Sequence, residues 1–297
     1  MSLLAKEDVY PSRVGDQPAI LERRDPTVYG HQAGPLSTVQ LNDYQDNGFL
    51  LWENLFSAAE VAKMRDDLVR IWRQSEDSAA PEVIREPGGD QVRSVFAVHE
   101  TDAAFNRVSR DPRLLNAARQ ILNSEVYVHQ SRINFKPGFT GQEFYWHSDF
   151  ETWHVEDGMP RMRALSCSIW LDDNFAFNGS LMVIPHSHHY FVACGGRTPK
   201  EHYKQSLRRQ EYGVPDRGSL SWLVEHHGIR MPEAKAGAVL LFDCNIMHGS
   251  NSNITPLGRR NVFLVYNSVE NPLAPPFSGE APRPSFLAHR NPETVVL

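Results

Sequence analysis

The chain has 297 residues, of which 41% are hydrophobic and 22% charged, as in an ordinary globular protein long enough to bury a sizeable core. Its formal net charge of −6 argues against nucleic acid or an anionic membrane surface as the main partner, and three cysteines without a C-x-x-C pair argue against a disulfide framework. No apolar run approaches the roughly 18–20 residues of a membrane span, and the amino terminus lacks a signal-peptide pattern, so we expect a cytoplasmic protein with no membrane and no nucleic-acid partner.

The amino-terminal part of the chain shows little pattern before Ser57. Residues 1–38 are rich in Pro, Gly and charge, and predict a segment that wraps the surface or stays mobile. Ser57 and Glu60 then form a capping-box pattern, and apolar residues follow at the spacing of a surface helix that covers a core. These apolar residues are Val61, Met64, Leu68, Ile71 and Trp72.

A second helix is expected after a loop. Residues 75–92 contain two prolines and two glycines, which predict the loop. Asp111 stands directly before Pro112, an order typical of a helix cap followed by the first helical position. We expect this second helix to run to about Leu122.

From Glu125 the apolar pattern changes to a period of two, which predicts a strand. One face of this strand would carry Val126, Val128, Gln130, Arg132, Asn134 and Lys136. The other face would carry Tyr127, His129, Ser131, Ile133 and Phe135. The first face is too polar for a simple core face, so it either lines a cavity or is solvated.

Further short strands are expected at 164–171, 180–184, 238–242 and 261–268, separated by turn residues. Short strands after an initial helical part predict helices packed outside a jelly roll or similar β-barrel. We expect a mainly β protein with flanking helices, with residues 1–297 in one domain. The polar residues 191–234 interrupt the strand pattern and predict a surface helix and loop near the mouth of the barrel.

Two side chains two residues apart suggest a metal site. On an extended chain His147 and Asp149 point to the same face, which supplies two groups of the 2-His-1-carboxylate triad that holds non-haem Fe(II). Among 13 histidines such a pair also arises by chance. The third group is expected from His248, which closely follows the apolar strand 238–242, and Arg259 opens the next strand eleven residues later.

This spacing has a chemical logic. Fe(II) needs three protein ligands and open positions for a bidentate 2-oxo acid and O₂. The far carboxylate of that acid needs a charged, planar partner, which Arg259 supplies. Ser250 can add a hydroxyl to the same carboxylate, and Lys136 on the polar strand can add a point charge. The four-part pattern therefore predicts an iron site with a 2-oxo-acid clamp.

The pattern His147-x-Asp149…His248…Arg259, with residues 179–188 between, resembles the phytanoyl-CoA hydroxylase-like family of Fe(II)/2-oxoglutarate dioxygenases. More narrowly, residues 144–160 and 130–138 resemble its ectoine-hydroxylating members, and the match runs from about residue 41 to 271. The resemblance implies a double-stranded β-helix (jelly roll, cupin-like) core, often a homodimer. It also implies conversion of ectoine to 5-hydroxyectoine with Fe(II), 2-oxoglutarate and O₂, releasing succinate and CO₂.

The resemblance further implies roles for individual residues. The implied iron ligands, which form the catalytic set, are His147, Asp149 and His248. The implied 2-oxoglutarate contacts are Lys136, Ser250 and Arg259, and the implied ectoine contacts are Gln130, Trp153, Phe242 and Phe263. Aromatic walls suit a flat cation and an amide suits a polar edge, although ordinary core packing is the alternative for each aromatic residue. Since Asp149 is a carboxylate, hydroxylation is expected rather than halogenation, for which relatives place a small residue there.

Three alternatives stay open at this stage. The same iron chemistry could act on another small cationic or amino-acid-like metabolite. A metal-free jelly-roll binding module would make the arginine spacing a coincidence, and a zinc hydrolase would want a general base near the metal and no 2-oxo-acid clamp. Among other histidines, those at 186, 188 and 189 follow Pro185 and predict a loop, and His154 is expected near the site or on the surface.

Overall fold

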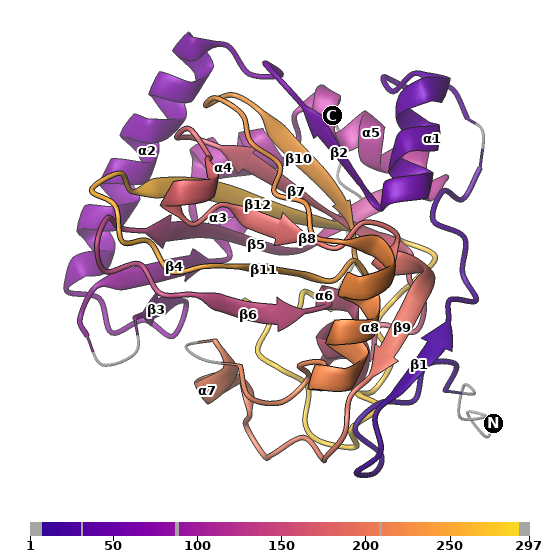
Figure 1. The fold of residues 1–297 in the computed structure, drawn as a ribbon. Coiled ribbons are helices and arrows are strands. Elements are labelled where there is room, and N and C mark those ends of the chain that lie inside the picture. Colours follow the sequence, from indigo (N-terminus) through magenta and orange to yellow (C-terminus); the bar gives the residue numbers. More distant parts are fainter. Residues whose placement is uncertain (1–7, 31, 87–88, 208–209, 291–297) are drawn as a thin grey trace.

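A seven-stranded antiparallel sheet forms one wall of the molecule and faces a smaller antiparallel sheet of three strands (Figure 1). The structure is a computed structural model that describes residues 8–30, 32–86, 89–207 and 210–290. Apolar side chains from both sheets, including Leu181 and Val183 of the small sheet and Phe242 and Phe263 of the large one, form a core between them. Two facing antiparallel sheets with helices outside are the predicted mainly β, double-stranded β-helix fold.

From residue 126 onward, the strands of the large and the small sheet alternate along the chain. The large sheet has the order β2 (Phe49–Trp52), β10 (Val239–Asp243), β7 (Ala164–Trp170), β12 (Arg259–Ser268), β5 (Val126–Lys136), β4 (Val92–Phe96) and β3 (Val83–Arg85). The small sheet has the order β6 (Phe144–His147), β11 (His248–Ser250) and β8 (Leu181–Val183). A separate pair joins β1 (Ala19–Glu22) to β9 (Tyr190–Ala193). The four later strands predicted from the sequence are confirmed as β7, β8, β10 and β12.

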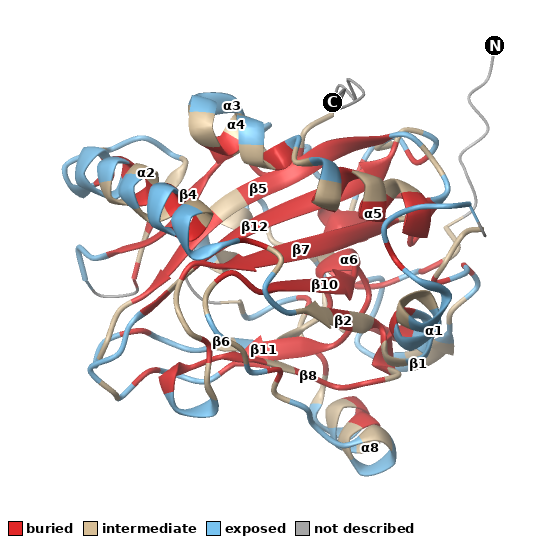
Figure 2. Ribbon diagram, turned by 90° about the horizontal axis from the view of Figure 1, so that it is seen from above, coloured by how far each residue is buried: buried red, intermediate tan, exposed pale blue. Residues whose placement is uncertain are grey.

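Two helices cover the outer face of the large sheet, where Figure 2 shows their buried sides against the strands. They are α2 (Ala58–Glu76) and α5 (Pro112–Leu122). Both predicted caps are present, since Ser57 and Glu60 form the capping box and Asp111 accepts from the Arg113 amide. Trp72, expected in the core, is 39% exposed because Ile71, one position earlier on the helix, already occupies the inward side.

The remaining helical elements are short. They are α1 (Thr38–Asn47), α3 (Val98–Thr101), α4 (Ala103–Ser109), α6 (Asp149–Thr152), α7 (Tyr203–Ser206) and α8 (Arg217–His227), with turns η1 (Trp153–Asp157), η2 (Ala176–Asn178) and η3 (Ser187–His189). In the described part of the chain, no helix combines the length and apolarity of a membrane span. The element α8 confirms the helix predicted within 191–234, whereas the strand β9 at its start was not predicted.

A β-bulge in β5 changes which face of the sheet the later side chains point to. Val128 pairs with Tyr266 and Gln130 pairs with Val265, so His129 has no opposite residue. The valines before the bulge therefore pack in the same core as the apolar residues near the end of the strand. The predicted single polar face was wrong before His129, and from Gln130 onward the polar residues alternate as expected.

The amino-terminal segment is more integrated than its composition indicated. Tyr10, Ser12 and Arg13 are buried, β1 pairs with β9, and α1 was not predicted; residues 1–7 lie outside the described part of the chain. Because α1 buries only Tyr44, no series of buried apolar residues at helical spacing marks this helix in the sequence. The predicted loop at 75–92 was also partly wrong, since it contains the end of α2, the short strand β3 and the start of β4.

Candidate metal centre and active site

Three side chains from separate elements converge at the small sheet. His147 ends β6, Asp149 begins α6, and His248 begins β11 directly opposite His147 in the ladder. One ligand atom from each lies within 4.8 Å of the others. Asp149 Oδ1 is 3.6 Å from His147 Nε2 and 3.9 Å from His248 Nε2, so all three could contact one ion.

Both imidazoles are oriented to present the same nitrogen. His147 Nδ1 lies 2.7 Å from the Tyr145 carbonyl oxygen, and His248 Nδ1 lies 3.0 Å from that of Ile246. Each carbonyl accepts the Nδ1 proton and leaves Nε2 as the free ligand atom, as metal-binding histidines require. Ser166 Oγ donates to the outer oxygen of Asp149 at 3.4 Å.

The protonation states also suit a divalent cation. Burial and the neighbouring charge of His147 lower the pKa of His248 to about 4, so this imidazole is neutral at physiological pH. Burial alone would raise the pKa of Asp149, but the two histidines and Arg132 lower it below its usual range. Two imidazoles and one carboxylate on one side of an ion match the facial triad of non-haem Fe(II), so the residues present fit this metal.

The predicted 2-oxoglutarate contacts lie together beside the metal ligands. Lys136 Nζ donates to Ser250 Oγ at 2.7 Å and to the Asn251 carbonyl oxygen at 2.6 Å. Arg259 faces Lys136 across the β12–β5 ladder, and its Nε donates to the Gly179 carbonyl oxygen at 2.7 Å. Among the described residues, no carboxylate forms a salt bridge with Arg259. Its charge is therefore available to a ligand.

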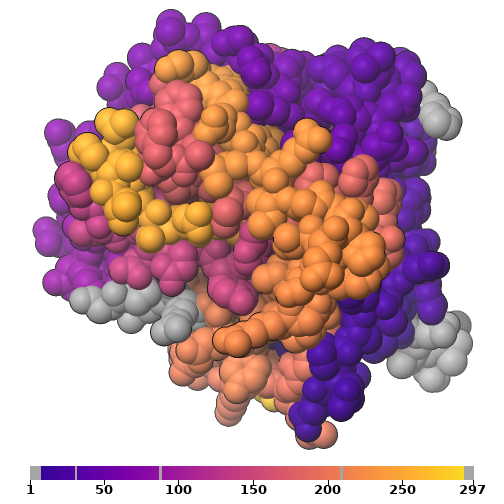
Figure 3. Space-filling view, in the orientation of Figure 1, coloured from indigo at the N-terminus to yellow at the C-terminus, as the bar shows by residue number. Residues whose placement is uncertain are grey.

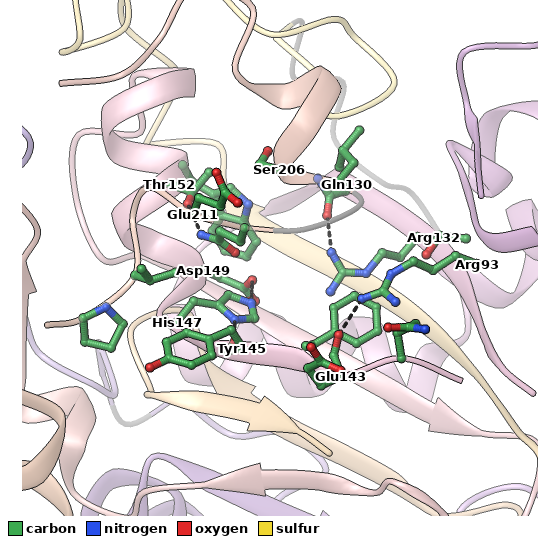
Figure 4. Close-up of a pocket in the computed structure, with 18 of the residues that line it drawn as sticks. Arg93, Gln130, Arg132, Glu143, Tyr145, His147, Asp149, Thr152, Ser206 and Glu211 are labelled. Carbon is green, nitrogen blue, oxygen red and sulfur yellow. Dashed lines mark hydrogen bonds and ion pairs between the residues drawn. The ribbon is translucent and has the colours of Figure 1, made fainter. Parts of the chain in front are cut away.

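A cavity of about 630 Å³ opens beside the metal ligands (Figure 4). Of the predicted substrate contacts, Gln130 and Trp153 line it together with His147 and Asp149. Residues between α7 and the start of α8 also contribute to the lining, which places the predicted insertion at the mouth of the barrel. This is large enough for a small metabolite next to the metal position.

The two predicted phenylalanine contacts lie one layer deeper. Neither Phe242 nor Phe263 is among the residues that line the cavity. The Phe242 ring is 5.2 Å from that of His248 and 6.5 Å from that of Phe263, and the Arg132 guanidinium lies 4.9 Å above Phe263. They form the floor under the metal ligand and under Arg132, within the core between the sheets.

Comparisons with known proteins agree with this geometry. Residues 44–261 match the family described as phytanoyl-CoA dioxygenase (PhyH). The chain belongs to this family. An ectoine dioxygenase of Bordetella bronchiseptica is 58% identical over 96% of this chain and 93% of its own length. Another, of Stutzerimonas stutzeri, is 52% identical over 95% of this chain and 94% of its own length.

Solved structures show the same arrangement of the chain. The structure of EctD from S. alaskensis with 2-oxoglutarate and 5-hydroxyectoine has a TM-score of 0.88 at 44% identity and covers 97% of both chains. The same protein with bound Fe has a TM-score of 0.87. AviO1 from Streptomyces viridochromogenes, at 20% identity and a TM-score of 0.61, shares the fold.

The sequence analysis gave no site role to Arg132, a cavity residue whose position pointed to one. Arg132 is half-buried, and its Nη1 donates to Gln130 Oε1 at 3.1 Å (Figure 4). Its Nε has no partner among the described residues. Burial, with Arg283 and Arg93 nearby, lowers its pKa. Its place two residues after Gln130, on the same polar face, was the signal that marks it as a cavity residue.

The structure also places the other histidines that the sequence analysis considered. His154 is buried, with Nε2 2.8 Å from Asp8 Oδ1 and Nδ1 2.8 Å from the Met159 carbonyl oxygen, so it supports the segment behind the site. The histidines at 186, 188 and 189 lie at η3, as the predicted loop requires. Within the described residues, only the His147, Asp149 and His248 group has metal-binding geometry.

Proposed function

We propose that this chain hydroxylates ectoine to 5-hydroxyectoine, using Fe(II), 2-oxoglutarate and O₂. The observation that carries the proposal is the convergence of His147, Asp149 and His248 beside a cavity lined by Arg132, whose guanidinium forms no salt bridge among the described residues. Near full-length similarity to proteins named ectoine dioxygenase supports the same substrate.

His147, Asp149 and His248 would hold the iron. When bound, Fe(II) and 2-oxoglutarate together activate O₂ for hydroxylation, with release of succinate and CO₂. The protein's own contribution is to orient the ligand atoms through the Tyr145 and Ile246 carbonyl groups and to exclude water from the site.

Arg259, Lys136 and Ser250 would hold 2-oxoglutarate through its far carboxylate. Arg259 is kept in place by neutral acceptors, namely the Gly179 carbonyl oxygen and the Asn261 side-chain oxygen, which lies 2.9 Å from Nη1 in the amide orientation that satisfies both groups. Neutral acceptors fix the guanidinium without cancelling its charge. A carboxylate entering this site therefore meets a buried, oriented cation.

Arg132, Gln130 and Trp153 would hold ectoine. Ectoine carries a carboxylate and a flat cationic amidine, so the substrate needs one cationic contact and one aromatic wall. Both Arg132 and Trp153 line the cavity, where Arg132 offers the cation and Trp153 offers the aromatic face. Phe242 and Phe263 support these groups from below.

We also propose a homodimer in the cytoplasm. The family resemblance implies the dimer, and three free, buried cysteines suit a reducing compartment. Light scattering of the purified protein tests the dimer: a mass of one chain contradicts it.

The substrate is tested by measuring succinate release with Fe(II), 2-oxoglutarate and a panel of small amino-acid-like metabolites. We expect ectoine to give the largest increase, with 5-hydroxyectoine formed in equal amount. A larger increase with another metabolite would change the substrate but keep the reaction class. No Fe(II)-dependent succinate release with any metabolite would favour the metal-free binding module.

A further inference from the structure

The segment formed by α6 and η1 presents different groups on its two sides. Asp149 and Trp153 face the cavity, whereas Glu151, Glu156 and Asp157 are not among the residues that line it. These three acids are 1%, 4% and 0% exposed, respectively. Buried carboxylates are costly unless positive groups and hydrogen bonds compensate them. Whatever compensates these acids therefore also determines where Asp149 and Trp153 point.

Arg13 compensates two of these acids at once. Its Nε and Nη2 donate to the two oxygens of Glu151 at 3.0 and 2.6 Å, and its Nη1 donates to Glu156 Oε1 at 2.6 Å. Ser12 Oγ adds a hydrogen bond to Glu151 at 2.6 Å. The guanidinium is 1% exposed, so this is a dry, bidentate pair with a third contact.

The two acids that Arg13 joins are five residues apart, at the point where the α-helical turn widens into a π-helical one. In a continued α-helix, Glu156 would lie about 140° around the axis from Glu151. A π-helical turn, with its i to i+5 hydrogen bonds, brings residues at this spacing back toward one line. A single guanidinium that binds both acids therefore favours the π-helical form, which sets the direction of Trp153.

Two further groups hold the end of the segment. Arg283 Nε and Nη2 donate to the two oxygens of Asp157 at 2.7 and 2.6 Å, and His202 Nδ1 lies 2.9 Å from Glu156 Oε1. Burial alone would raise the pKa of Glu156, but His202, Arg283 and Arg13 lower it to about 2. Arg13 and Arg283 both lie outside the residues matched by the family, 44–261.

The surroundings of Arg13 are built closely around it. Its backbone has φ 56°, a left-handed conformation that costs a non-glycine residue of order 1–3 kcal/mol and persists only when other contacts hold it. Gly213, from the connection before α8, approaches so closely that a Cβ there would stand 2.1 Å from Arg13 Nη2. Figure 3 shows the amino-terminal segment and the α8 region side by side on the same face of the molecule.

We propose that Arg13 is a positioning residue for the active site. By joining Glu151 to Glu156 it fixes the π-helical turn, and this turn sets Asp149 toward the metal and Trp153 toward the substrate. The proposal rests on the proposed function for the roles of Asp149 and Trp153. Arg13 lies outside the residues that match the family, so this support comes from a segment beyond the matched part of the chain.

The test is Arg13→Lys, which keeps the positive charge but cannot bind three carboxylate oxygens on two acids with one nitrogen. Arg24→Lys, exposed on the same segment, is the matched control. In Arg13→Lys we expect the KM for ectoine and the Fe(II) dissociation constant to rise about tenfold, as for supporting groups of metal ligands. The amount of succinate formed should exceed the amount of 5-hydroxyectoine, which means that the two reactions are less tightly coupled. Amide hydrogen exchange should be faster in residues 150–158 alone.

Glu156→Gln gives a second, milder variant that removes the negative charge from one arm of the bridge, keeps an amide oxygen there as an acceptor, and leaves the Glu151 pair intact. We expect smaller shifts of the same kind. If both variants match Arg24→Lys in metal affinity, KM, coupling and exchange, or lose only thermal stability, Arg13 has no positioning role. If the wild-type protein does not hydroxylate ectoine, the proposed function fails. Fe(II) affinity and local exchange still decide the positioning claim in that case.

Discussion

Two buried arginines of this protein, Arg13 and Arg259, occupy opposite electrostatic situations. Arg13 binds two carboxylates, and these acids raise its pKa although burial alone would lower it. Arg259 is held by neutral oxygens, and burial lowers its pKa to about 10. A buried arginine that is already neutralised holds structure together, whereas one left without an acid is prepared for an anionic ligand.

The two arginines also differ in what surrounds them. Arg259 lies with Lys136 and Ser250 on strands inside the residues that match the family, where β-ladders fix their spacing. Arg13 reaches the site from an amino-terminal segment outside that match. The proposed cosubstrate contacts therefore lie on ladders within the family match, whereas the contacts of Arg13 with Glu151 and Glu156 come from outside it.

The largest expected effect is on the free energy of unfolding, which should differ between variants of Arg13 and Arg259. Arg13→Met leaves two buried acids without their cation and should lower the free energy of unfolding by about 3–5 kcal/mol. Arg259→Met removes a cation that no acid compensates and should leave the stability of the metal-free protein unchanged or raised. Urea unfolding of both variants measures this, and equal destabilisation would contradict the comparison.

The next largest effect is on the KM values, since loss of Arg259 should affect 2-oxoglutarate and not ectoine. Arg259→Met should raise the KM for 2-oxoglutarate about 100-fold, since it removes charge-assisted hydrogen bonds worth about 1.5–3 kcal/mol each. The KM for ectoine should change little. Initial rates at varied concentrations of each compound give both values, with Arg260→Met, whose arginine pairs with Asp172, as the control. A similar rise in both KM values would mean that Arg259 serves the whole site.

A third prediction concerns Arg132, a half-buried arginine of the cavity that forms no salt bridge among the described residues. Arg132→Met should raise the KM for ectoine about 10–100-fold and leave the KM for 2-oxoglutarate nearly unchanged, because the lost contact is to the substrate carboxylate. The same rate measurements test it. An unchanged KM for ectoine would remove Arg132 from the proposed substrate site.

The smallest expected effect is the number of protons that the protein takes up when 2-oxoglutarate binds. Burial and the nearby charges of Arg259 and Arg93 lower the pKa of Lys136 to about 6, so its amine is neutral at pH 8 in the free site. A bound dicarboxylate raises this pKa, so binding of 2-oxoglutarate at pH 8 should take up close to one proton, and at pH 5 almost none. Calorimetry in two buffers of different ionisation enthalpy measures the uptake. No uptake at pH 8, or loss of a proton, would contradict it.

Much of the fold and the metal site follows from the sequence because strong local signals carry them. The two predicted helix caps and the strand patterns predicted α2, α5 and the later strands, and the His-x-Asp spacing with His248 predicted three residues that the structure brings together. The bulge at His129 could not be predicted, because one extra residue changes every later face without a local signal.

The contacts of Arg13 could not be predicted for a different reason. Its partners lie 138 and 143 residues away, so no pattern of spacing connects them. The amino-terminal segment has a composition typical of a surface loop, yet a few buried polar contacts anchor it behind the site. Long-range ion pairs of this kind become visible only when the chain is folded.

The central claim is that His147, Asp149 and His248 hold one iron beside the substrate. An anaerobic crystal structure with Fe(II), 2-oxoglutarate and ectoine tests it most directly. We expect iron within bonding distance of His147 Nε2, Asp149 Oδ1 and His248 Nε2, with the ectoine ring in the cavity between Arg132 and Trp153. Iron at another position, or an ectoine ring outside that cavity, would contradict the account.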